Sequence, residues 1–140
     1  MLLGDPASGD ALELHVVGYE FPDVVDDDYD SNWLVIAGTV SHDGRSWSFR
    51  EPCLLAGEAL ALAEWISHPS TVPPAFIEPL LEFAHDQGIL RVSLGAEAVE
   101  PGGDPGERVN LRIPVSAPAL ADAASAWRAS LAEFPPRAVA

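Results

Sequence analysis

The apolar run NWLVIAGTVS, residues 32–41, is the feature that most restricts the fold of this chain. It is rich in β-branched and aromatic side chains and is apolar at both odd and even positions, which is typical of a central strand. The Asp43-Gly44 pair that follows favours a two-residue hairpin turn. Beyond the turn, the segment SWSFR places Trp47 and Phe49 on one face of a returning strand. The sequence therefore predicts an antiparallel hairpin early in the fold.

Two-residue alternation predicts further strands on either side of this hairpin. Ala11–Tyr19 alternates ahead of it, and residues 89–99 and 108–115 alternate after it. Pro79 interrupts the apolar run at residues 75–84, and proline is confined to the edges or bulges of sheets. We therefore expect an edge strand or a bulged strand at that position.

Two segments show helical spacing instead. Residues 54–68 place Leu55, Ala59, Leu62 and Ile66 on one stripe, and Pro69 ends the segment. Residues 116–134 repeat the pattern with Leu120, Ala124, Trp127, Leu131 and Phe134, and Ser116 is suited to cap that helix. The predicted fold class is α+β: an antiparallel sheet of about six strands in the order β-β-β-α-β-β-β-α, with both helices packed on the sheet. We expect one domain over residues 1–140, with an ordered core at about residues 11–134 and short loose termini.

Charge is the most informative property of the composition. Twenty-two acidic residues against seven basic ones give a net charge of −15, and all seven basic residues are arginine. Such a chain repels a phosphate backbone, so we expect no direct binding to nucleic acid. It attracts a basic protein and accelerates that encounter. Solubility alone is the competing explanation of the acidity.

The acidic residues are densest between two predicted strands, where five aspartates fall within the eight residues 23–30. An EF-hand loop starting at Asp26 requires glycine at its sixth position and glutamate at its twelfth, but this chain has Ser31 and Ala37 there. A strand also follows where that loop requires a helix. We therefore predict no metal site, although a looser cation site formed by Asp26, Asp28 and Asp30 stays open as an alternative.

Candidate nucleophiles and acid–base pairs do not assemble into a catalytic pattern. Ser41, His42 and Asp43 are consecutive, and neighbouring strand residues point to opposite faces, so they do not form a triad. Cys53 could be activated ahead of the first helix, but a buried small apolar role is favoured. Glu78 and Glu82 could form a carboxylate pair on one side of a strand, but a solvated strand face is favoured. We predict no enzyme, no catalytic residue and no cofactor.

The compartment is also suggested by the sequence. The single cysteine cannot form an internal disulfide, no apolar run is long enough to span a bilayer, and the first ten residues do not have the pattern of a signal peptide. These features predict a cytosolic protein without a membrane partner.

Several motifs together resemble the bacterial WapI-type immunity proteins. These are LHVVGYEFPD, then DDDYDSNWLVIAGTV, then WSFREPCLL leading into an acidic helix, and finally FIEPLLEF and LGAEAVEP. The resemblance covers roughly residues 12–115. It implies a cytosolic antitoxin-like protein that binds and neutralises the toxic C-terminal domain of a large YD-repeat polymorphic toxin, a domain that is often a basic nuclease. The Glu78–Phe83 segment keeps the frame of the corresponding family motif but loses its polar residues.

The resemblance and the charge pattern together divide the acidic segment into two parts. We expect Tyr19, Phe21 and Trp33 to form an aromatic hinge, and Asp30 and Asn32 to bond backbone amides of the turn. The tip is the candidate surface for a basic partner, and its acidic residues are Asp23, Asp26, Asp27 and Asp28.

Two other readings stay open. The first is a structural or adaptor domain of the same fold without a toxin partner. The second is a protein that binds a small ligand or a cation, or a cryptic enzyme. A deep pocket lined by Glu78, Glu82 or His85 would favour a small-ligand binder or an enzyme. The sequence does not settle the oligomeric state.

Overall fold

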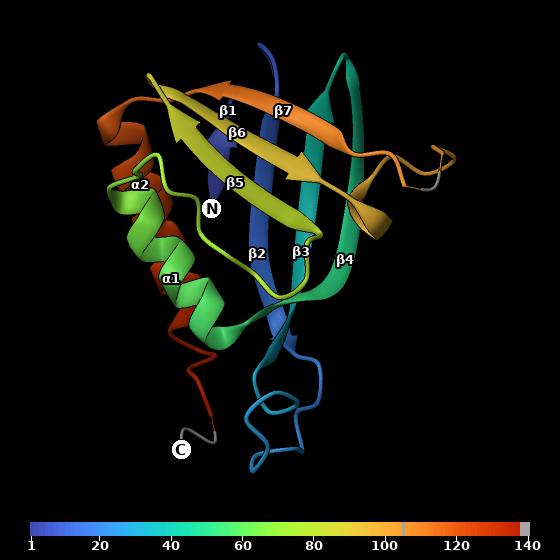
Figure 1. Cartoon of the computed structure of the whole chain (residues 1–140), viewed down its shortest axis with the longest axis vertical. Helices are drawn as coiled ribbons and strands as arrows, with labels where there is room; N and C mark the ends of the chain where they lie inside the picture. The colour runs from blue at the N-terminus through green and yellow to red at the C-terminus, as the bar shows by residue number, and fades with distance from the viewer. Residues whose placement is uncertain (105, 138–140) are drawn as a thin grey trace.

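The strands form two antiparallel sheets in the computed structural model, which describes residues 1–104 and 106–137 (Figure 1). The first sheet has the order β1-β2-β3-β4, with strands Leu2–Gly4, Ala11–Tyr19, Trp33–His42 and Arg45–Leu55. The second has the order β5-β6-β7, with strands Leu81–Asp86, Ile89–Leu94 and Val109–Pro114. The α+β class and the antiparallel pairing are confirmed, whereas the prediction of a single six-stranded sheet is wrong.

The strand pattern explains why one sheet and two sheets cannot be told apart from the sequence. In β2, β5, β6 and β7 alternate residues are buried, so each strand has one apolar face and one exposed face. A stack of two sheets satisfies this alternation as well as one sheet under helices does. The helix and the connector between β4 and β5 carry the chain from the first sheet to the second, and the two sheets cross over a shared core (Figure 1).

The predicted hairpin is present at the centre of the first sheet. Strand β3 pairs with both β2 and β4, and His42 pairs with Arg45 across the turn. Asp43 and Gly44 both have positive φ values, 54° and 76°, as a type I′ turn requires. The extra residue opposite the Leu34–Val35 step of β3 is Cys53, because Leu34 pairs with Leu54 and Val35 with Pro52.

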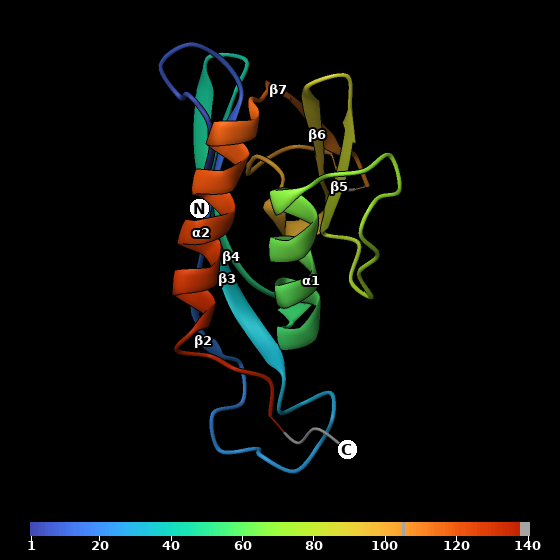
Figure 2. The ribbon, with the colours of Figure 1, turned by 90° about the vertical axis from the view of Figure 1, so that its left-hand side faces the viewer.

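The two helices are α1, Ala56–Ser67, and α2, Ala117–Leu131. They lie side by side along one flank of the two sheets (Figure 2). Trp127 of α2 is fully buried and its Nε1–H donates to the carbonyl of Ala59 in α1 at 2.9 Å. The hydroxyl of Ser116 accepts from the backbone N–H of Ala119, so this residue caps α2 as its position in the sequence predicts.

The first ten residues are more ordered than the sequence suggested. Strand β1 pairs with β2, and the amino group of Met1 donates to the carbonyl of Leu14 at 2.8 Å. At the other end, the chain runs back from α2 toward the β2–β3 connection (Figures 1 and 2), while residues 138–140 lie outside the described part.

Candidate functional site

The connection between β2 and β3, residues 20–32, forms a loop at one end of the molecule, which we call the acidic loop (Figure 1). The backbone N–H of Glu20 donates to the carbonyl of Trp33 at 2.9 Å, so the ladder between β2 and β3 continues to the base of the loop. Asp23, Asp26, Asp27, Asp28 and Asp30 are all exposed there.

Asp27 differs from the other aspartates because its carboxylate is bound inside the loop. Its Oδ1 atom accepts from the backbone N–H groups of Tyr29 and Asp30, at 2.9 and 2.8 Å. Its own N–H donates to the hydroxyl of Ser31, which is fully buried. This is an Asx-type turn, and it gives Asp27 the backbone-bonding role that the sequence assigned to Asp30.

Asn32 joins the acidic loop to the segment that follows α2. Its side-chain amide donates to the carbonyl of Asp28 at 2.8 Å and to the carbonyl of Arg137 at 2.7 Å. Its Oδ1 atom accepts from the backbone N–H of Arg137 at 2.6 Å. All the polar atoms of this buried side chain are therefore hydrogen-bonded.

The guanidinium of Arg137 donates hydrogen bonds to backbone carbonyl groups at both ends of the loop. It donates to the carbonyls of Ser31, Pro22 and Phe21 at 2.9, 2.9 and 3.0 Å. The same group lies 3.6 Å from the centre of the Tyr19 ring, a cation–π contact. One arginine thus fixes both ends of the loop. The sequence reasoning missed it, and the only available signal was an isolated cation in the short tail of an acidic chain.

Tyr19 finds its main partners in the same segment. Its ring packs edge-on against Phe134 with centroids 5.6 Å apart, and its hydroxyl donates to the carbonyl of Pro135. Burial raises the pKa of Tyr19, and the nearby Arg137 guanidinium opposes this shift. Of the other two residues of the predicted hinge, Phe21 is 40% exposed and Trp33 is half-buried at the start of β3.

Apolar side chains accompany the aspartates on the surface of the loop. Val25 and Tyr29 are each 59% exposed, and Phe21 is also exposed. Partly exposed aromatic groups surrounded by polar residues are a common feature of protein-binding surfaces. The sequence reasoning did not single out Val25 or Tyr29, because neither falls in a strand or helix pattern.

Further carboxylates lie near the base of the loop. Burial raises the pKa of Glu51 in β4, and the charges of Glu97 and Glu20 raise it further. Like charges close enough to shift one another destabilise the folded state, so this grouping has an energetic cost. The three carboxylates come from separate segments: Glu20 from the acidic loop, Glu51 from β4 and Glu97 from the short 3-10 helix Ala96–Ala98.

The side chains considered for catalysis or metal binding do not come together. Burial raises the pKa of the Cys53 thiol to about 12, so it is an unreactive core residue. Glu78 precedes β5 rather than lying on it, so the prediction that Glu78 and Glu82 share one side of a strand is wrong. Across residues 1–104 and 106–137, no group of three or more His, Cys, Asp or Glu side chains is arranged to hold a metal ion. Asp26, Asp28 and Asp30 therefore do not form the looser cation site.

These features define a small two-sheet α+β protein with an acidic loop whose backbone is held by hydrogen bonds to Asp27, Asn32 and Arg137. Residues 1–135 match the model of the immunity protein WapI-like family, and the chain belongs to this family. The resemblance seen in the sequence motifs is thereby confirmed. Comparisons with curated proteins and with solved structures give no significant match. Neither helix of the described structure is long and apolar enough to cross a membrane.

Proposed function

We propose that this protein is a non-enzymatic, cytoplasmic immunity protein that binds and neutralises a cognate toxin domain through its acidic loop. The family match supports the toxin-neutralising role. The net charge of −15 favours a basic partner, such as a nuclease-like toxin domain, because opposite potentials steer the two proteins together.

The observation that supports the proposal is that different residues of the loop hold its backbone and expose its carboxylates. Asp27, Asn32 and Arg137 hold its backbone through hydrogen bonds. The carboxylates of Asp23, Asp26 and Asp28 have no hydrogen bond or ion pair within the described structure and are exposed beside Val25 and Tyr29. A loop that is ordered before binding loses less conformational entropy when the partner arrives, so its carboxylates present a preformed surface.

The experiment compares two variants that each remove three negative charges. The test variant is D23N/D26N/D28N, which leaves Asp27 in place so that the turn is preserved. The control is D104N/E107Q/D122N, whose three side chains are exposed elsewhere in the described structure. Binding is measured with a catalytically inactivated form of the toxin domain encoded beside the immunity gene, at two salt concentrations.

We expect the test variant to bind about tenfold more weakly or worse, mainly through a slower association rate. The control should retain most of the affinity, and salt should weaken binding of the unmodified protein. Cells that express the toxin should be protected by the unmodified protein and the control but not by the test variant. Equal binding by both variants would exclude the loop as the contact surface, and absence of both binding and protection would exclude the immunity role.

A further inference from the structure

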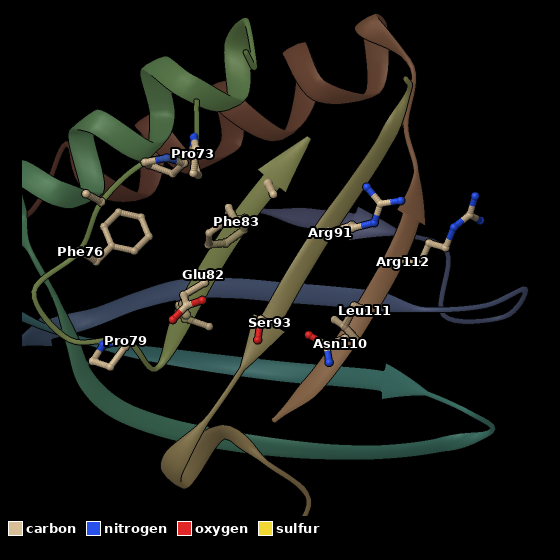
Figure 3. A pocket seen from close by; sticks show the side chains of 14 residues that line it. Pro73, Phe76, Pro79, Glu82, Phe83, Arg91, Ser93, Asn110, Leu111 and Arg112 are labelled. Carbon is tan, nitrogen blue, oxygen red and sulfur yellow. The ribbon is translucent and has the colours of Figure 1, made fainter. Parts of the chain in front are cut away.

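A groove with a volume of about 670 Å³ crosses the outer face of the second sheet (Figure 3). The strands of this sheet and the acidic loop lie at different ends of the molecule (Figure 1). One wall is the connector between α1 and β5, and the floor is formed by β5, β6 and β7. The residues that matter for its chemistry are Pro73, Phe76, Pro79, Ala84, Arg91 and Arg112.

The strand register places two arginines side by side in this groove. Ala84 of β5 pairs with Arg91 of β6, and Arg91 pairs with Arg112 of β7, so the three form one row across the sheet. Like charges directly opposite each other on neighbouring strands are destabilising. Figure 3 shows both arginine side chains on the side of the groove opposite Pro73 and Phe76.

The carboxylates near this pair form their hydrogen bonds and ion pairs with other groups, or lie beyond ion-pair distance of both guanidinium groups in the described part of the chain. Within residues 1–104 and 106–137, neither Arg91 nor Arg112 makes a salt bridge, whereas Arg45 and Arg128 each pair with a glutamate at 3.1 Å. Glu82, in the next row, has Arg108 at 3.6 Å.

Asp10 reaches the edge of the sheet, but both of its oxygens are engaged. One accepts from the backbone N–H of Arg112 at 2.9 Å, and the other lies 2.9 Å from Nδ1 of His42. Asp86 of β5 pairs with Ile89, which lies two residues before Arg91 on β6. In the described part of the chain, Asp86 makes no ion pair with either arginine. A chain with 22 acidic residues thus leaves two adjacent arginines without a salt bridge at this place.

The apolar wall is held in position by α1. The Nε1–H of Trp65 donates to the carbonyl of Val72 at 2.9 Å, and the carboxylate of Glu58 accepts from the backbone N–H of Ile77 at 2.7 Å. Phe76 packs edge-on against Phe83 with centroids 6.3 Å apart. The groove is therefore formed in the free protein, as ligand sites usually are.

We propose that this groove binds a small organic anion, with its carboxylate or phosphate group between Arg91 and Arg112 and its apolar body over Ala84, directed toward the wall formed by Phe76 and the prolines. Paired guanidinium groups suit a planar or tetrahedral oxyanion. The net charge of −15 repels a large polyanion at long range, which favours a ligand with one or two charges. This site is separate from the acidic loop and does not depend on the proposed toxin partner.

The test is an NMR titration of the isotope-labelled full chain with benzoate, phenyl phosphate, inorganic phosphate and benzyl alcohol. The test variant is R91Q/R112Q. The matched control is R50Q/R128Q, which also removes two exposed arginines but from β4 and α2. A short peptide of alternating glutamate and phenylalanine is titrated in parallel.

We expect benzoate or phenyl phosphate to shift amide signals of β5, β6 and β7 saturably, with a dissociation constant of about 1 mM or below. Benzyl alcohol lacks the charge and inorganic phosphate lacks the apolar body, so both should bind more weakly. Affinity should fall at least about tenfold in R91Q/R112Q and stay unchanged in R50Q/R128Q.

The proposal is overturned if no saturable shift occurs at these strands, or if both variants bind alike. Binding of the acidic peptide alone would also overturn it and would assign the groove to a protein segment. These outcomes leave the toxin-binding result unaffected, since that experiment uses other residues.

Discussion

The side-chain amide of Asn32 and the backbone of Arg137 bond each other in both directions, although the two residues are 105 positions apart. The Nδ2 atom donates to the Arg137 carbonyl at 2.7 Å, and Oδ1 accepts from the Arg137 N–H at 2.6 Å. Two residues paired in an antiparallel sheet exchange the same two hydrogen bonds, but here the Asn32 side-chain amide takes the place of one backbone. The acidic loop and the segment after α2 therefore form one structural unit.

Replacing Asn32 should destabilise the protein by about 2 kcal/mol, because Asn32→Ala removes three partly buried hydrogen bonds to backbone groups of Asp28 and Arg137. The free energy of unfolding in urea measures this. Asn110→Ala is a matched control, since Asn110 is exposed, and its effect should stay within about 0.5 kcal/mol. Equal stability of the two variants would contradict the role given to Asn32.

Arg137→Lys should loosen the acidic loop even though the charge is kept. Lysine cannot reproduce the planar fork that reaches the carbonyls of Phe21, Pro22 and Ser31. Amide hydrogen exchange at Tyr29 and Asp30 should become faster, while exchange in β6 should not change. Unchanged protection of the loop in this variant would show that the guanidinium geometry is unimportant there.

Glu51→Gln should stabilise the protein at pH 7. The pKa of Glu51 is raised in the folded state, so the folded protein favours the neutral carboxyl. The contribution of this preference to the free energy of unfolding is fully present below the pKa of the unfolded chain. It is lost as the pH rises through the folded pKa. Once ionised, the carboxylate is partly desolvated and is repelled by the charges of Glu97 and Glu20. The gain should stay below about 1 kcal/mol because these groups are partly hydrated.

The pH profile provides the control for Glu51. Unfolding free energies of the unmodified protein and the variant should converge as the pH falls well below 4.5, the ordinary glutamate pKa, where the carboxyl is neutral in both states. A difference that stays constant from pH 7 to well below 4.5 would mean that the substitution acts through packing rather than charge.

Cys53 should resist thiol reagents in the folded protein. Burial raises the pKa of its thiol to about 12, with smaller contributions from the charges of Glu51, Glu58 and Glu78, so the thiolate is scarce at pH 8. A disulfide reagent such as Ellman's reagent should label it slowly in buffer and within seconds in denaturing urea. Rapid labelling without denaturant would contradict the burial of this residue.

Local pattern was sufficient for most of the secondary structure. The alternation in β2 and β7, the Asp43-Gly44 turn and the Ser116 cap all depend on neighbours within a few residues. The division of the strands into two sheets does not depend on near neighbours, because it is set by which strands pair across long stretches of the chain. Each strand has the same apolar face in either arrangement, so alternation carries no information on that choice.

The site shows the same division between local and distant information. That the aspartates face water could be predicted from their density and from the absence of an apolar period. Asp27, however, differs from Asp26 and Asp28 only through the fold of the loop. The contribution of Arg137 depends on a contact between chain segments more than 100 residues apart, and no local spacing encodes it.

The position of Arg137 has a consequence for how the protein is made. Ribosomes synthesise the acidic loop more than 100 residues before the arginine that fixes it. On a nascent chain, the strands of the first sheet can begin to pair before the hydrogen bonds from Arg137 to the loop can form. The hydrogen bonds within residues 27–32 can form early, but the contacts to Arg137 form only after that residue has left the exit tunnel.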